Sequence, residues 1–140
     1  MKVALATLLI LGSVIAHFIA MYTGVYDAQM RQGVVWFDNV LHAIVGIAFG
    51  LVWLAILRRW RPESGMLYTS ATVLGFVFAV AIMWELFELV FYLVFKSGAL
   101  GLKVYSPSLN EAIFDSLSNL FGGALLLVLF SFKNTNVKER

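Results

Sequence analysis

The chain has 140 residues, of which 61% are hydrophobic and 13% are charged, and its mean hydropathy is +0.90. Soluble domains usually carry about 25% charged residues, and a chain of this length lacks the interior to bury so much apolar surface. The composition therefore excludes a soluble globular domain and predicts an integral membrane protein. The formal charge of +2 does not suggest a nucleic-acid partner, and the absence of cysteine excludes disulfides, thiolate metal sites and thiol catalysis.

Four apolar runs follow one another along the chain, and each is long enough to cross a bilayer as a helix. Only helices and closed barrels pair every backbone group within hydrocarbon, and continuous rather than alternating apolar residues favour helices. The sequence therefore predicts an all-α fold, an integral membrane four-helix bundle, with residues 1–140 forming a single transmembrane domain. The predicted spans are residues 3–22, 36–57, 66–95 and 112–132.

The basic residues are distributed unequally over the two ends of the predicted bundle. By the positive-inside rule this predicts a multi-pass protein of the inner membrane with both termini inside (N-in/C-in). The inner side holds Lys2, Arg58, Arg59, Arg61, Lys133, Lys138 and Arg140, and the outer side holds Arg31, Lys96 and Lys103. Aromatic residues near the outer ends, Tyr26 among them, are expected to form an interface belt. Alternatively, residues 1–16 are a cleaved signal peptide, which leaves three spans.

Acids and histidines inside the predicted spans are the candidate functional residues, because charges are rare and costly in hydrocarbon. Three spans each carry two polar residues three or four positions apart, so each pair shares one helix face. The pairs are Asp38 with His42, Glu85 with Glu88, and Asp115 with Asn119, and His17 stands near the outer end of the first span. Counted from the outer ends, none lies more than about 15 Å deep. They are interpreted as one site in the outer half of the bilayer that opens outward.

Charge balance suggests a metal in this site. The spans contain four acids but neither Lys nor Arg, and a buried carboxylate without a partner costs several kcal/mol. The countercharge must come from protons, monovalent cations or a divalent metal, and carboxylates with neutral imidazoles suit Zn, Fe, Mn or Co better than Mg or Ca. The predicted metal ligands are Asp38, His42, Glu85, Glu88 and Asp115, with Asn119 and His17 as supporting residues. The pattern assigns no catalytic residue.

Structural roles remain open for several of these residues. Asp38 can be a helix N-cap, and Glu111 can be a solvated first-turn acid that the helix dipole favours. His17 can be a packing or interface histidine. Asp115 and Asn119 can form an interhelical hydrogen-bond pair. The two acids of the third span are the hardest to explain in this way, because nothing nearby in the sequence pairs with them.

The ordered motifs resemble a known bacterial family. They are Asp38-xxx-His42-xxx-Gly46, then Trp84-Glu85-xx-Glu88, then Asp115-xxx-Asn119-xx-Gly122. This set resembles the YjdF-like inner-membrane proteins and is more distantly similar to the VanZ-like family, which is linked with glycopeptide resistance. Two departures weaken the VanZ-like resemblance more than the YjdF-like one. Glu111 stands where Asp is expected, and Glu88 stands near a position that is Gln in the VanZ-like pattern. The resemblance implies a small helical envelope protein, makes the six polar residues of these motifs the family's motif residues, and supplies no substrate.

Three functions fit the sequence. In the first, the protein binds a metal at the outer leaflet and acts as a hydrolase or transferase on a lipid-linked substrate. Membrane lipids are then its expected partners. In the second, the protein is a noncatalytic scaffold, a resistance or an immunity-type protein whose polar cluster fixes helix packing. In the third, the acids relay protons or cations, although the inner halves of the spans carry few polar residues and a single chain would have to oligomerise to form a route.

Overall fold

The computed structural model describes residues 2–31, 36–95 and 108–138. Five helices account for nearly all of these residues: α1 (Lys2–Thr23), α2 (Val25–Arg31), α3 (Trp36–Trp60), α4 (Met66–Phe95) and α5 (Leu109–Lys138). Four are long and apolar enough to cross a membrane, over Val3–Thr23, Trp36–Trp60, Met66–Val94 and Leu109–Ser131. The predicted all-α fold and multi-pass membrane character are therefore confirmed. The N-in/C-in orientation stays a prediction, and residues 96–107, between the last two predicted spans, lie outside the described residues.

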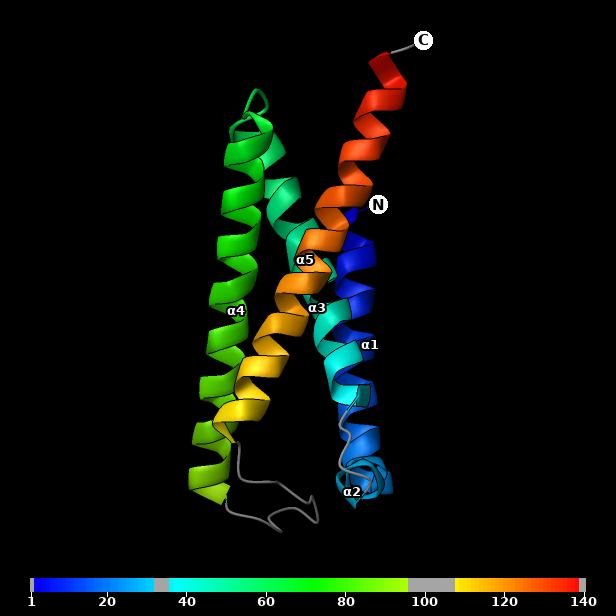
Figure 1. The fold of residues 1–140 in the computed structure, drawn as a ribbon, viewed down its shortest axis with the longest axis vertical. Coiled ribbons are helices and arrows are strands. Elements are labelled where there is room, and N and C mark those ends of the chain that lie inside the picture. Colours follow the sequence, from blue (N-terminus) through cyan, green and yellow to red (C-terminus); the bar gives the residue numbers. More distant parts are fainter. Residues whose placement is uncertain (1, 32–35, 96–107, 139–140) are drawn as a thin grey trace.

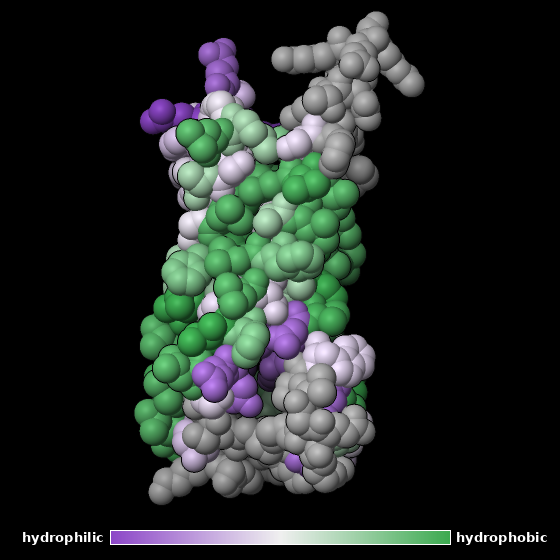
Figure 2. All heavy atoms as spheres, in the orientation of Figure 1, coloured by the Kyte–Doolittle hydropathy of each residue, from purple (hydrophilic) through white to green (hydrophobic). Residues whose placement is uncertain are grey.

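The four long helices are arranged around a central pair, α3 and α5. Figure 1 shows α1 on one side of this pair and α4 on the other, with α2 at one end of the bundle and both termini toward the opposite end. The α3–α4 turn lies at the end that holds the termini. An apolar band covers the middle of the molecule, and hydrophilic atoms lie in it nearer the α2 end (Figure 2). The following sections call this the α2 end.

The connection between the first two spans contains a short helix that the sequence did not predict. Gly24 has a φ of 74°, the left-handed region that glycine enters without strain, and it separates α1 from α2. On α2, Tyr26 and Gln29 are buried rather than exposed at an interface. Gln29 accepts a hydrogen bond from the backbone N–H of Phe37 at 3.2 Å and so satisfies a free donor in the first turn of α3.

The helix pair α3–α5 is held by reciprocal backbone contact. A Cβ placed on Gly46 would collide with the carbonyl oxygen of Asn119, and a Cβ placed on Gly122 would collide with that of Ala43. Hydrophobic driving force between helices is absent in lipid, so small residues that permit close approach become the main packing device. The two glycines therefore set the distance between the central helices.

Toward the end that holds the termini, the central pair encloses an apolar core with α4. Its buried members are Leu54, Leu57, Val73, Val77, Leu126 and Leu127. At the α2 end, α5 begins with a capping box, in which the Ser108 N–H donates to Glu111 and the Glu111 N–H donates to the Ser108 hydroxyl. Glu111 is thus a helix-capping acid.

Glycine-to-alanine substitution at the central crossing should destabilise the bundle. Gly46→Ala adds a methyl group where backbone already lies, and we expect the free energy of unfolding to fall by about 1–3 kcal/mol, the usual cost of overpacking. Gly75→Ala is the matched control, because its Cβ would meet nothing within 4 Å. Thermal unfolding in detergent measures both, and equal stability of the two variants would contradict this account of the crossing.

The predicted orientation can be tested because the chain has no cysteine. Glu63 and Asn110 are exposed at opposite ends of the bundle. In intact cells, a membrane-impermeant maleimide should label the Asn110→Cys variant and should label Glu63→Cys only after permeabilisation. The reverse pattern would show that the termini face outward.

Candidate metal centre

Asp38, His42 and Asp115 meet near the α2 end, where α3 faces α5. One ligand atom from each lies within 4.8 Å of the other two. The Nε2 atom of His42 is 3.9 Å from a carboxylate oxygen of Asp38 and 3.9 Å from one of Asp115. His42 and Asp115 are buried, with 6% and 7% of their surfaces exposed. Helix spacing brings Asp38 to His42, and the α3–α5 crossing brings Asp115 to both.

The 3.9 Å separations are informative. They exceed the length of a hydrogen bond, so the three groups do not satisfy one another directly. Atoms that each lie about 2.0–2.2 Å from a shared zinc ion are separated by nearly this distance at wide ligand angles. The triad of Asp38, His42 and Asp115 therefore leaves room for one small bridging species, either a metal ion or a water molecule.

Asn119 fixes the orientation of the His42 ring from the other side. Its amide nitrogen lies 2.9 Å from Nδ1 of His42 and donates to the backbone carbonyl of Asp115 at 3.0 Å. An amide nitrogen only donates, so Nδ1 of His42 accepts, and the hydrogen of the neutral ring lies on Nε2. Nε2 then points that hydrogen at the two carboxylates. For Nε2 to bind a metal instead, the amide of Asn119 has to turn over and offer its oxygen to an Nδ1 hydrogen.

A second group of side chains contacts Asp38 from α1 and α2. Tyr26 donates to Asp38 at 3.0 Å, and its hydroxyl lies 2.8 Å from Nδ1 of His17. Because the single phenolic hydrogen goes to Asp38, Nδ1 of His17 donates to the phenol oxygen. Burial, together with the charge of Asp38, raises the pKa of Tyr26, so the phenol stays protonated as a donor.

His17 also links α1 to α4. Its Nδ1 is 3.4 Å from Asp38, and its Nε2 is 3.9 Å from Glu88. The indole N–H of Trp84 donates to Glu88 at 2.9 Å. When protonated, His17 supplies a positive charge between two acids, which is a countercharge that the sequence analysis did not assign.

The remaining predicted ligand, Glu85, is placed differently. One of its carboxylate oxygens is buried and has no hydrogen-bond partner among the described residues. Of the five predicted ligands, the structure thus brings three into one triad, attaches Glu88 to it through His17, and leaves Glu85 beside it. The assignment of both glutamates as ligands stays a prediction.

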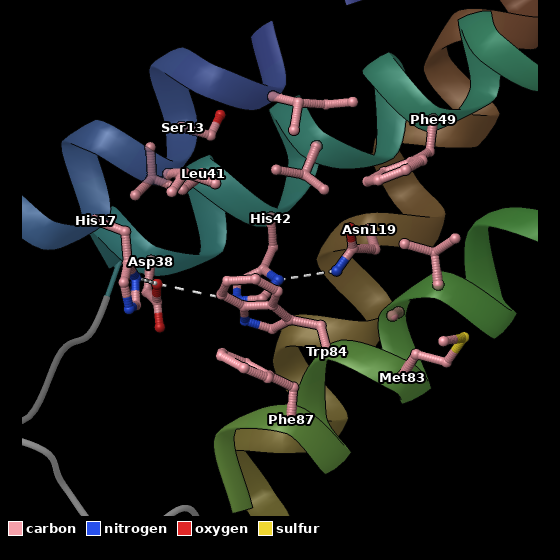
Figure 3. A pocket seen from close by; sticks show the side chains of 15 residues that line it. Ser13, His17, Asp38, Leu41, His42, Phe49, Met83, Trp84, Phe87 and Asn119 are labelled. Atoms are coloured by element: carbon pink, nitrogen blue, oxygen red, sulfur yellow. Dashed lines mark hydrogen bonds and ion pairs between the residues drawn. The ribbon is translucent and has the colours of Figure 1, made fainter. Parts of the chain in front are cut away.

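A cavity of about 350 Å³ adjoins the triad. Figure 3 shows His17, Asp38, His42 and Asn119 at its polar part, with Trp84 and Phe87 of α4 facing them and Phe49 farther along α3. Sequence reasoning missed this cavity, and it missed Tyr26, whose burial depends on α2. The available signal for Tyr26 was its position three residues before Gln29, which places both on one face of a short helix.

The fold and site define a multi-pass membrane protein with a buried carboxylate–imidazole cluster. The chain matches the family described as predicted membrane protein (DUF2238) over residues 2–136, and it belongs to that family. This confirms the resemblance to the YjdF-like proteins, which are this family, while the VanZ-like resemblance stays a prediction. No curated protein and no solved structure matches the chain.

Removal of the Tyr26 hydroxyl should loosen the site. In Tyr26→Phe, both Asp38 and His17 lose a buried hydrogen-bond partner, and we expect the free energy of unfolding to fall by about 1–3 kcal/mol. Tyr22→Phe is the matched control, because Tyr22 is 82% exposed. Unfolding in detergent compares the two variants, and a Tyr26→Phe protein as stable as the control would show that the network contributes little.

Proposed function

We propose that the protein binds one divalent transition metal between α3 and α5, and that this metal serves a hydrolytic or transfer reaction on a lipid-linked substrate. The observation that carries the proposal is the triad of Asp38, His42 and Asp115, with its 3.9 Å separations. Two carboxylates and one imidazole suit Zn, Fe, Mn or Co. Two negative ligand charges would also be compensated by a divalent ion.

The number and surroundings of the ligands favour a reactive rather than a purely structural metal. Catalytic zinc sites keep three protein ligands and one open position, whereas structural sites are closed by four. Asp38 is also held by Tyr26 and His17, and outer partners of this kind orient metal ligands. When bound, the metal would lower the pKa of a water molecule and polarise a phosphoryl or acyl group.

The neighbouring cavity favours a lipid-linked substrate. Asp38 and His42 line it, so a substrate in the cavity would reach two of the three proposed ligands. The remaining lining is mostly apolar, which suits a molecule with a polar head and a hydrocarbon tail.

A noncatalytic scaffold is the second candidate, and the bond between Asn119 and His42 favours it. In the orientation observed, His42 directs an N–H rather than a lone pair at the carboxylates. A cluster of this kind, bridged by water, would lock α3 to α5 without a metal. Conduction of ions is less well supported, because the end that holds the termini is packed around a cluster of buried apolar side chains.

Metal analysis separates the two candidates. The protein purified in mild detergent without chelator should carry about one equivalent of a transition metal by elemental analysis. Asp115→Asn should reduce the affinity by more than the 10- to 100-fold that loss of an outer-shell partner typically costs. Glu111→Gln is the control, because this acid caps α5.

Two results would count against the metal. A wild-type protein that contains none and takes up none on addition of Zn, Mn, Fe or Co would favour the scaffold. Equal metal content in wild type and a folded Asp115→Asn variant would place the ion elsewhere. The Glu85→Gln, Glu88→Gln double variant then shows whether the glutamates are ligands, since the triad alone should retain most of the metal.

A further inference from the structure

The cavity beside the triad is polar at one end and apolar at the other. Its polar end is formed by His17, Asp38, His42 and Asn119, near the α2 end of the bundle. Its apolar end reaches Ile10 of α1, Phe49 of α3 and Val80 of α4. Asp38 and Phe49 are eleven residues apart on one helix, so the cavity extends roughly 16 Å along the bundle.

The walls of the cavity suggest access from the lipid. α1 and α4 line opposite sides of it, yet these two helices scarcely pack on each other within the described residues. The contacts that join them are the 3.9 Å approach of His17 to Glu88 and the edge-on contact of the His17 and Trp84 rings, 6.2 Å between centroids. Both lie at the polar end. Between these contacts and the end that holds the termini, a hydrocarbon chain could pass sideways between α1 and α4 without breaking a polar contact.

Ser13 supplies a polar group partway along the cavity. It lines the cavity one helical turn from His17 and is only 6% exposed. Other hydroxyls of α1 bond to the carbonyl four residues earlier, as Thr7 and Thr23 do. The Ser13 hydroxyl makes no such bond and has no hydrogen-bond partner within the described part of the chain. Because Ser13 lines the cavity, its hydroxyl can donate to an acceptor on a ligand there.

We propose that the cavity binds the carbonyl end of one fatty-acyl chain of a membrane lipid, with the ester carbonyl at Ser13, the next part of the chain against Phe49 and the head group at Asp38 and His42. This inference rests on the proposed function for the role of the head group, which would meet the metal there. The chain site itself depends only on the cavity.

Volume and chemistry favour a single acyl ester over other lipids. About 350 Å³ lies near the lower limit of ligand cavities, roughly 300–1,000 Å³, and suits one chain better than two. An isoprenyl phosphate has no ester carbonyl for Ser13.

Photocrosslinking of a lipid probe tests the proposal. The full chain is reconstituted in vesicles of phosphatidylethanolamine and phosphatidylglycerol that contain a monoacyl phosphatidylcholine with a diazirine partway along the acyl chain. Mass spectrometry then locates the adducts. We expect them to concentrate at Phe49 and Val80, and Val14→Trp, which fills the cavity, should reduce them at least tenfold. Ile15→Trp is the matched control, because Ile15 is 58% exposed and does not line the cavity.

The role of Ser13 has its own readout. Ser13→Ala should weaken retention of the ester probe by about 2- to 10-fold, the value of one hydrogen bond. The same variant should leave an ether-linked probe, which lacks the carbonyl, unchanged. Equal losses for the two probes would overturn the placement of the ester at Ser13.

The remaining outcomes distinguish the acyl-chain site from the proposed metal site. Adducts at Phe49 and Val80 that persist in chelator-treated protein support the chain site whether or not metal analysis succeeds. Adducts spread over exposed residues of α1 and α4, with no effect of Val14→Trp, would indicate ordinary surrounding lipid and overturn the inference. Displacement of the probe by farnesyl phosphate but not by unlabelled acyl ester would overturn it in favour of an isoprenyl chain.

Discussion

The backbone contact between α3 and α5 is the constraint on which the rest of this structure depends. Gly46 lies against the Asn119 carbonyl, and Gly122 lies against that of Ala43, so neither helix tolerates a side chain at the crossing. His42 is one turn before Gly46, and Asn119 is one turn before Gly122. Close approach at the glycines therefore forces these two side chains together, and Asp115 follows because it lies one turn before Asn119 on α5.

The outer helices are attached to this pair by different means. α1 packs along α3 and, with α2, contacts the site through the hydrogen bonds and charges of His17 and Tyr26. α4 packs through an apolar core near the opposite end, and at the site Trp84 donates to Glu88, which approaches His17. Within the described residues, α3 and α5 are therefore closely packed, whereas α1 and α4 scarcely pack on each other.

The sequence predicted those features that follow from helix geometry and the bilayer. Four spans, the shared face of Asp38 with His42 and the common depth of the polar residues all result from a fixed rise and period. It could not predict which faces meet, because the spacing within one helix says nothing about its rotation toward its neighbours. Glu85 and Asp115 were both predicted as ligands, and the sequence favoured Glu85, yet of the two only Asp115 joins the triad. Tyr26 was assigned to an interface belt because α2 was read as part of a loop.

The polar cluster also needs two arrangements if it is to bind a metal. Without an ion, the Asn119 amide holds the Nδ1 atom of His42 as an acceptor, and the ring points a hydrogen at the two acids, so attraction replaces repulsion. To bind an ion, Nε2 of His42 must offer a lone pair instead of a hydrogen. The Asn119 amide must then turn over so that its oxygen accepts from Nδ1. That rotation breaks the bond from Asn119 to the Asp115 carbonyl, which lies in the helix that carries the third ligand. Binding of a metal would therefore be coupled to the hydrogen bonding of α5 through one amide, located beside the glycines that fix the helix crossing.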